Sequence, residues 1–270
     1  MTAPLLAIEN LTRDYTLRAK GATRHLRAVD GVSLAVEPGS IFAVVGESGC
    51  GKSTLARIVM ALDRPTGGTV RLGGDDLFAL SPKALARKRR DFQMVFQDPY
   101  GSLNPRHSVG RIVAEPLHLL DDAPRGRDRQ SLVARALEDV GLPAQAAERY
   151  PHEFSGGQRQ RIAIARALIT NPKLVVADEA VSALDLSIQA QILRLILSLR
   201  DRHGLTVLFI THNIGVVDEV ADRVGVMQAG RLVETGTVRE VLDHPREDYT
   251  RTLLAAEPTL AVLGRRRRRA

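Results

Sequence analysis

Residues 41–54 read IFAVVGESGCGKST, an unbroken apolar run followed by a glycine-rich turn. A short run of purely apolar residues is typical of a strand that is buried on both faces of a parallel sheet. The turn fits the pattern G-x-x-x-x-G-K-[ST], which leads from such a strand into a helix. There the glycines let backbone N–H groups surround phosphate oxygens, and the dipole of the following helix adds to the attraction. The stretch therefore predicts a phosphate-binding loop in an α/β domain.

The loop supplies the first candidate ligands of a nucleotide. Lys52 would reach the β- and γ-phosphates, and the Ser53 hydroxyl would bind Mg²⁺. Cys50 fills a variable position, where we interpret it as a small packing residue rather than a redox switch. A chance glycine-rich turn is the alternative, but the strand before it and the helix after it argue against that. The candidate residues are Gly46, Glu47, Ser48, Gly49, Cys50, Gly51, Lys52, Ser53 and Thr54.

Two further apolar runs, 174–177 and 206–210, also end in polar residues. Open α/β sheets hold their ligands at the carboxyl ends of the strands, so the three runs predict one shared site. In that site Asp178 would hold Mg²⁺, directly or through water, and Glu179 would polarise the attacking water. A histidine at a strand end is more often structural when taken alone. Beside the loop and the two acids, His212 is suited to sense the γ-phosphate.

The rest of the chain alternates between strand-like and helix-like segments, which favours an α/β fold with a largely parallel sheet. Apolar residues at helical spacing predict a packed helix over 188–199. Residues 224–234 predict a β-hairpin with a glycine turn. Residues 99–154 are rich in Arg, Asp, Pro and Ala, and we expect an inserted, mostly helical subdomain there. Within it, 132–140 is a helical patch and 121–128 a surface loop.

The composition is that of a globular protein, with 44% hydrophobic and 26% charged residues among 270. A single cysteine excludes an intrachain disulfide framework and a cysteine-cluster metal site, and it fits a reducing compartment. The first residues lack the pattern of a signal peptide, and the longest apolar run, 192–199, is interrupted by Arg194. We therefore expect a cytoplasmic protein.

The net charge of +7 is concentrated at one end of the chain, because Arg265–Arg269 supply five of the seven charges. A nucleic-acid-binding protein usually spreads its basic residues over a folded face, so no nucleic-acid partner is expected. We interpret the arginine tail as a solvated end, with contact to anionic lipid or to nucleic acid as the alternatives.

Residues 154–161, FSGGQRQR, lead into the helix-like run 162–168. Ser155 is a good N-cap residue, so this stretch predicts a second helix N-terminus that is suited to phosphate. One nucleotide does not need two such ends from one chain. Two chains in a head-to-tail arrangement would let each enclose the ATP of the other. Alone, the octapeptide would be read as a capped surface helix with solvated arginines.

Together with the other motifs, this stretch makes the chain resemble the ATPases of the ABC transporters over about residues 5–258. The resemblance implies that Gln97 is the Q-loop residue near Mg²⁺ and that Tyr15 stacks on adenine. It also implies a P-loop (RecA-like) core at 5–98 and 155–244 with an N-terminal antiparallel β part. The inserted subdomain would then span 99–154, and a C-terminal extension 245–270. The implied signature and D-loop residues, which would cap the partner's ATP, are Ser155, Gly156, Gly157, Gln158 and Asp185.

Within that family the chain resembles the second (F- or E-type) ATPase of oligopeptide, dipeptide and nickel importers. The residues that carry this likeness are 96–106, 150–154, 184–191, Pro245, Tyr249–Thr250 and Leu253–Leu254. The resemblance implies a different ATPase subunit as partner, two transmembrane permease subunits and an extracytoplasmic binding protein. It also implies a position at the cytoplasmic face of the inner membrane, with Asp98–Arg106 transmitting motion to the permease.

Peptides are the expected cargo, and nickel or a metal chelate is the alternative within the same family. A non-transport ABC ATPase is a remote alternative, because the chain has one cassette and no long coiled-coil insertion. A GTPase is disfavoured by the lack of an Asn-Lys-x-Asp motif, and a scaffold without hydrolysis by Glu179 and His212. Ala180 stands where the family more often has proline, and Asn213 where it has aspartate. We expect both departures to leave a competent subunit.

Overall fold

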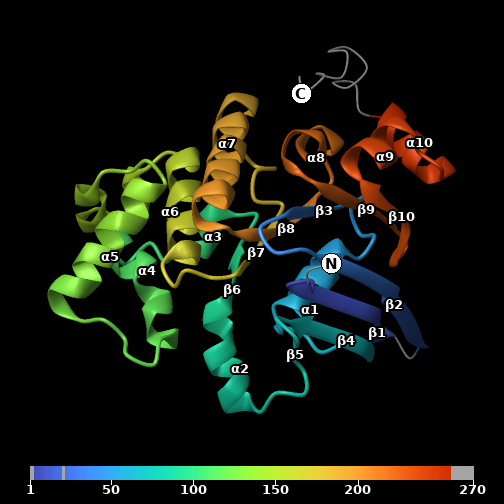
Figure 1. Ribbon diagram of the computed structural model, residues 1–270, viewed down its shortest axis with the longest axis horizontal. Helices are drawn as coiled ribbons and strands as arrows, with labels where there is room; N and C mark the ends of the chain where they lie inside the picture. Colours follow the sequence, from blue (N-terminus) through green and yellow to red (C-terminus); the bar gives the residue numbers. More distant parts are fainter. Residues whose placement is uncertain (1–2, 20–21, 257–270) are drawn as a thin grey trace.

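The computed structural model describes residues 3–19 and 22–256, so Arg265–Arg269 lie outside the described residues. Two sheets and a group of helices make up the described part of the chain (Figure 1). The first sheet is antiparallel, in the order β2-β1-β4-β5. Its strands are β1 (Leu6–Ala19), β2 (Ala22–Val36), β4 (Gly67–Leu72) and β5 (Asp75–Asp76).

The second sheet, which we call the core sheet, has the order β10-β9-β3-β8-β7-β6 and is parallel except for β10 at one edge. Its strands are β3 (Ile41–Val45), β6 (Phe92–Val95), β7 (Leu174–Asp178), β8 (Thr206–Thr211), β9 (Arg223–Gln228) and β10 (Arg231–Thr237). The three predicted apolar strands and the predicted hairpin are confirmed. The hairpin turn needs a glycine because Gly230 has a φ of +85°.

Most of the helices cover the core sheet or form the group at its β6 edge. The α-helices are α1 (Lys52–Val59), α2 (Pro82–Lys88), α3 (Pro99–Ser102), α4 (Val109–Val113), α5 (Gly126–Asp139), α6 (Gly156–Leu168), α7 (Leu186–His203), α8 (Ile214–Val220), α9 (Val238–Asp243) and α10 (Asp248–Ala255). Short 3₁₀ helices span Arg89–Asp91, Glu115–Leu119, Ala144–Glu148 and Pro151–Glu153.

Side chains of β3 alternate between two hydrophobic cores, one on each face of the core sheet. Phe42 and Val44 belong to the core that includes α1 and the antiparallel sheet, so α1 is enclosed between the two sheets (Figure 1). Ile41, Ala43 and Val45 face the core that includes α6, α7 and α8. Because both faces are covered, each strand of this region must be apolar throughout, as the sequence is.

The helical region between β6 and β7 differs in one detail from the expectation. The helix predicted at 132–140 is part of α5, which already begins at Gly126, so the expected surface loop 121–128 ends earlier. Gly126 has a φ of +52°, a conformation that suits glycine at the entrance to a helix. The α6 helix packs against α3, α4 and α5 (Figure 1). Within the described residues, no helix combines the length and the hydropathy needed to span a membrane.

Candidate active site

The conformation of the loop 46–54 depends on two glycines that have no room for a side chain. A Cβ atom on Gly46 would lie 2.1 Å from the carbonyl oxygen of Met227. At Gly51 the φ is +112°, and a Cβ atom would lie 2.2 Å from the carbonyl oxygen of Ala28. Backbone from β2 and β9 therefore confines the loop, which leaves Ser48 and Gly49 exposed at its outer side.

Lys52, the first residue of α1, is folded into this loop and is only 4% exposed. Its ammonium nitrogen donates hydrogen bonds to the carbonyl oxygens of Gly46, at 2.6 Å, and Glu47, at 2.8 Å. A buried cation needs such partners to offset its lost hydration. The positive charge of Lys52 is thus held inside the loop, at the N-terminus of α1, a position that favours phosphate binding.

Cys50 is buried in the same loop, with its sulfur 3.8 Å from the ammonium nitrogen of Lys52. Burial raises the pKa of the Cys50 thiol, although the nearby Lys52 charge opposes this effect. A raised pKa disfavours the reactive thiolate. The surroundings of Cys50 therefore agree with its interpretation as a packing residue.

Asp178 ends β7 beside the loop, and its Oδ1 atom is buried without a hydrogen-bond partner. Burial, together with the charge of Glu179, raises the pKa of Asp178 above its ordinary 3.8, against the opposing effect of the Ser53 hydroxyl. A buried carboxylate oxygen without a partner, next to a serine hydroxyl, is the donor chemistry that a hard divalent cation prefers. These residues fit Mg²⁺.

Glu179 follows at the carboxyl end of the core sheet in a left-handed conformation, with a φ of +48°. Such a conformation is strained for a residue with a Cβ atom, costs on the order of 1–3 kcal/mol, and clusters at functional sites. It is held by the N–H of Glu179, which donates to the carbonyl oxygen of Ile210 at 2.8 Å.

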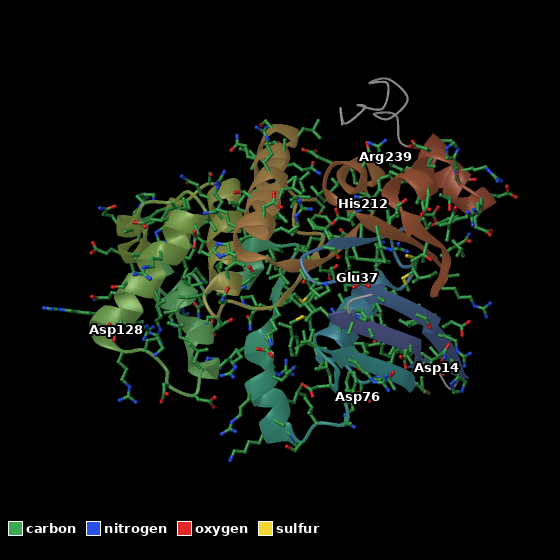
Figure 2. All side chains as sticks on the ribbon, in the orientation of Figure 1. Asp14, Glu37, Asp76, Asp128, His212 and Arg239 are labelled. Atoms are coloured by element: carbon green, nitrogen blue, oxygen red, sulfur yellow. The ribbon has the colours of Figure 1, made fainter. Side chains whose placement is uncertain are left out.

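His212 lies directly after β8, and its Nδ1 atom is 3.4 Å from Oε1 of Glu179. The histidine is about half exposed, whereas the Glu179 side chain is 15% exposed. Figure 2 shows His212 at the core sheet, well separated from Asp128 on α5. The parallel register pairs Asp178 with Ile210 and Val45 with Thr211, which brings three strand ends to one place. The predicted convergence is therefore present.

Ser155 is the N-cap of α6, as expected from the sequence. Its hydroxyl accepts a hydrogen bond from the N–H of Gln158, and the Gln158 side chain accepts one from the N–H of Ser155. Both residues are exposed. In the described part of the chain, no hydrogen bond or ion pair joins 155–158 to the loop 46–54. This helix end is instead satisfied by its own side chains.

Asp185 and Gly157 lie at the starts of α7 and α6, respectively. Asp185 is the exposed N-cap residue of α7, and its carbonyl oxygen accepts a hydrogen bond from the N–H of Gln189. Gly157 packs on α7, because a Cβ atom there would lie 2.5 Å from Cγ2 of Ile188. The start of α6 therefore lies against the start of α7.

Gln97 is exposed just after β6, and the segment that follows it is tied to α6. Asp98 caps α3 by accepting a hydrogen bond from the N–H of Tyr100 at 2.8 Å. Arg166 donates to the carbonyl oxygen of Ser102 at 2.6 Å, and the Arg159 guanidinium lies 4.0 Å from the centre of the Tyr100 ring. Both arginines are on α6, so this helix and the segment after Gln97 are held together.

Tyr15 belongs to a polar cluster that the sequence did not reveal. Its hydroxyl donates to Oδ2 of Asp63 at 2.6 Å, and the Arg13 guanidinium lies 4.4 Å from the centre of its ring. Burial opposes ionisation of Asp63, but hydrogen bonds from Tyr15 and Arg64 and the charge of Arg13 leave its pKa lowered. Strand spacing brings Arg13 to the same face as Tyr15. Asp63 has no comparable sequence signal.

Comparisons with known proteins decide the family. Residues 29–182 match the family model described as ABC transporter. The chain belongs to this family. It is an ABC ATPase of the oligopeptide and dipeptide importer type, whose ATP hydrolysis is coupled to transport.

Two relatives and two solved structures illustrate the match. The ABC ATPase is 47% identical to the dipeptide transport ATP-binding protein DppF of Escherichia coli, over 98% of this chain and 80% of that protein. It is 48% identical to the glutathione import ATP-binding protein GsiA of Escherichia coli, over 94% of this chain but only 41% of GsiA. The dimeric ATP-binding cassette MJ0796 with ADP and Pi has a TM-score of 0.76 at 31% identity, covering 87% of this chain and 99% of that one. The cassette cbiO1 of Clostridium perfringens has a TM-score of 0.77 at 26% identity, covering 97% and 99%.

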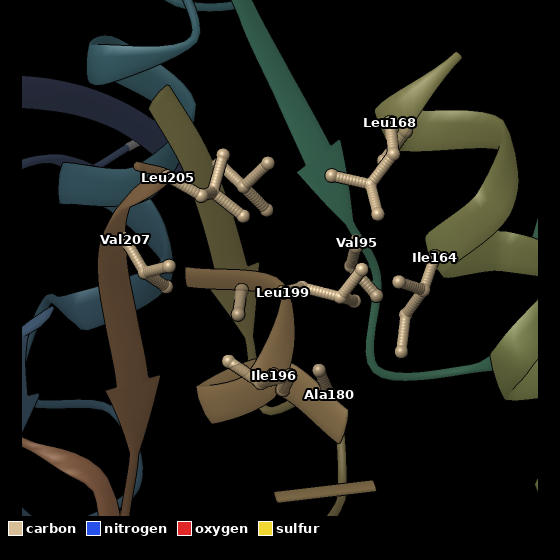
Figure 3. A pocket seen from close by; sticks show the side chains of 11 residues that line it. Val95, Ile164, Leu168, Ala180, Ile196, Leu199, Leu205 and Val207 are labelled. Carbon is tan, nitrogen blue, oxygen red and sulfur yellow. The ribbon is translucent and has the colours of Figure 1, made fainter. Parts of the chain in front are cut away.

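Asn213 and Ala180, the two positions at which we expect departures from the family, have separate structural settings. Asn213 caps α8, with its side-chain oxygen accepting a hydrogen bond from the N–H of Val216 at 3.1 Å. Asparagine caps a helix about as well as aspartate, so the N-cap hydrogen bond directly after His212 is retained. Ala180 is buried and lines a small pocket enclosed by aliphatic side chains of the core sheet, α6 and α7 (Figure 3). The pocket has no polar side chain in its lining, and we assign it to packing.

Proposed function

We propose that this ABC ATPase energises the import of peptides across a membrane. The observation that carries the proposal is its likeness, over nearly the whole chain, to a dipeptide transport ATP-binding protein. GsiA, named for glutathione import, and the probable peptide ABC transporter ATP-binding protein y4tS of Sinorhizobium fredii, 48% identical over 96% of this chain and 74% of that protein, support the same class of cargo. Glutathione is itself a short peptide.

In this proposal the loop 46–54 binds the phosphates of ATP. Lys52 moves its ammonium group from the carbonyl oxygens of Gly46 and Glu47 towards the β- and γ-phosphates. Ser53, Asp178 and Gln97 are the residues that would hold Mg²⁺, which neutralises phosphate charge when bound. The unpartnered Oδ1 atom of Asp178 supports this assignment. Tyr15, which has the Arg13 guanidinium over one face of its ring, would stack on adenine.

Glu179 and His212 form the hydrolytic pair of the proposal. Glu179 orients the attacking water and accepts its proton, a role typically worth about 10²–10⁴-fold in rate. His212 contacts Glu179 and is about half exposed, so it can also reach a γ-phosphate at the strand ends. The left-handed backbone of Glu179 supports the role, because strained backbone of this kind clusters at functional sites.

The second half of each site would come from another ATPase subunit. Ser155–Gln158 and Asp185 would cap the partner's nucleotide, and the exposure of this helix end supports that use. MJ0796 has been solved as a dimer with ADP and Pi. Because ATP would bind the closed pair better than ADP and Pi do, hydrolysis would drive opening.

The remaining partners are two permease subunits and an extracytoplasmic binding protein, with the ATPase pair a heterodimer at the cytoplasmic face of the membrane. Asp98–Arg106 would transmit motion to the permease. The hydrogen bond from Arg166 and the cation–π contact from Arg159 support that role, since they join this segment to α6. The division into a core at 5–98 and 155–244, a helical subdomain at 99–154 and an extension at 245–270 is part of the same proposal.

The test is uptake by intact cells. Cells that carry Glu179→Gln should lose uptake of labelled di- and oligopeptides, whereas the exposed control Glu148→Gln should retain it. Uptake of labelled Ni²⁺ is measured in the same cells. Loss of nickel uptake alone would move the protein to the metal branch, and unchanged uptake of both would contradict the proposed cargo.

A further inference from the structure

Tyr249 connects the C-terminal helix α10 to the phosphate-binding loop. Its hydroxyl oxygen accepts a hydrogen bond, 3.2 Å long, from the backbone N–H of Glu47. The ring is partly buried against the hydrophobic core. Burial also raises the pKa of the Tyr249 hydroxyl, so it remains protonated at neutral pH. Residues 202 positions apart are thus in direct contact at the site of ATP.

The N–H of Glu47, which donates to Tyr249, belongs to the same peptide group whose carbonyl oxygen accepts a hydrogen bond from Lys52. The carbonyl oxygen of Gly46 and the N–H of Glu47 belong to one planar peptide unit and point in opposite directions. Lys52 donates to that carbonyl oxygen at 2.6 Å, while Tyr249 accepts from that N–H. The two side chains therefore hold one peptide group from opposite sides.

The start of α10 is itself anchored to the core sheet through β10. Glu234 is a charged residue only 9% exposed, and its carboxylate accepts hydrogen bonds from the N–H groups of Arg246, at 2.8 Å, and Glu247, at 3.3 Å. Burial opposes ionisation of Glu234, but the Thr250 side chain, these two N–H groups and the Arg246 charge together leave its pKa lowered. Arg251 also donates to the carbonyl oxygen of Arg246 at 2.7 Å. Tyr249 is therefore presented to the loop from a fixed position.

We propose that Tyr249 is a positioning residue for the nucleotide phosphates, which makes the C-terminal segment part of the ATP site. When Lys52 leaves the Gly46 carbonyl for phosphate, the peptide group loses the partner on one side. The hydrogen bond to Tyr249 on the other side keeps it from turning, so the loop retains its shape. This inference rests on the assignment of the loop 46–54 to phosphate.

The test uses Tyr249→Phe in the full chain, which removes the hydroxyl and keeps the ring. The matched control is Thr252→Val, since within the described residues the exposed Thr252 hydroxyl on the same helix donates only to the carbonyl oxygen of Asp248. Dissociation constants for ATP, ADP and AMP are measured by displacement of a fluorescent nucleotide. One neutral hydrogen bond corresponds to a loss of ATP and ADP affinity of about three- to tenfold. Binding of AMP should be unchanged, because AMP has no β-phosphate.

The possible results distinguish a failure of the Tyr249 role from a failure of phosphate binding by the loop 46–54. If Tyr249→Phe binds ATP like the wild type, or loses ATP and AMP affinity equally, the positioning role is wrong. If the wild type binds ATP no better than AMP, the loop assignment fails, and the inference with it. Glu234→Gln provides a second test, because it loosens the start of α10 and leaves the tyrosine in place. It should weaken ATP binding in the same selective way, and an unchanged ATP affinity would contradict the anchoring of α10.

Discussion

The loop 46–54 and the N-terminus of α6 are both suited to phosphate, but they are satisfied in opposite ways. In the loop, Lys52 is buried and is held by carbonyl groups of the loop itself. At α6, Ser155 and Gln158 are exposed and cap each other. The loop is also confined by backbone from other strands, at Met227 and Ala28, whereas the start of α6 rests on α7.

This difference indicates that a single chain completes the half of the site at the loop 46–54, whereas the half at the start of α6 is left for another molecule. A buried charge with fixed partners requires surrounding structure, and the core sheet provides it within one molecule. An exposed helix end can satisfy its own N–H groups and still attract phosphate from outside. We therefore expect nucleotide binding to depend on the loop and the residues that hold it, but not on the start of α6, and hydrolysis to depend on both regions.

The largest expected effect comes from the hydrolytic pair beside the loop. Glu179→Gln should lower steady-state phosphate release by the assembled complex by about 10²–10⁴-fold, because the amide cannot accept the proton of the attacking water. Binding of ATP should remain. Full phosphate release by this variant, measured beside Glu148→Gln, would refute the assignment of the base.

The next largest effect is on ATP affinity and concerns the buried charge of Lys52. Lys52→Ala should weaken ATP binding by about 10- to 100-fold, as expected for a lost charge-assisted hydrogen bond to phosphate. The dissociation constant of the purified chain is the measurement, and the exposed Lys83→Ala serves as control. An unchanged affinity would mean that the phosphates do not bind at Lys52.

The third effect concerns the N-terminus of α6. Ser155→Ala removes the cap of α6, at a cost of about 0.5–2 kcal/mol in stability, and removes a proposed contact to the partner's nucleotide. ATP affinity of the isolated chain should stay within about twofold, while hydrolysis by the complex should fall about tenfold or more. The control is Ser81→Ala, which removes the corresponding cap of α2. A loss of affinity in the isolated chain would erase the distinction between the two regions.

The smallest effect is on stability and follows from the raised pKa of Asp178, whose main cause is burial. A carboxyl group with a higher pKa in the folded chain costs stability once the pH rises above the unfolded value, near 3.8. Without nucleotide, Asp178→Asn should therefore raise the melting temperature at pH 7 by about 2–4 °C.

The gain from Asp178→Asn should shrink as the pH falls through the raised pKa of the folded chain and disappear well below 3.8, where the wild-type carboxyl is protonated in both states. Thermal melts over this pH range, beside the exposed control Asp122→Asn, give the answer. Addition of Mg²⁺ and ATP should stabilise the wild type more than the variant. A gain that did not depend on pH would mean that burial of the Asp178 charge is not its cause.

Local pattern was enough to predict several parts of this protein. The strands at 41–45, 174–178 and 206–211 are readable because a sheet covered on both faces requires unbroken apolar runs. The cap at Ser155 is readable because the capping residue and its partner, Gln158, are three positions apart. Each of these features depends on residues that are close in the sequence.

The contacts that shape the site depend on how distant parts of the chain pack. Tyr249 meets Glu47 across 202 positions, and Tyr15 meets Asp63 across 48, so no local pattern marks either pair. The left-handed backbone of Glu179 is likewise not evident from its residue type, and the N–H of Glu179 donates to Ile210 on the neighbouring strand. The amino-acid sequence was enough to identify the chemical groups at the strand ends. Packing of distant segments decided how those groups are held, because a hydrogen bond between remote residues forms only after the chain has folded.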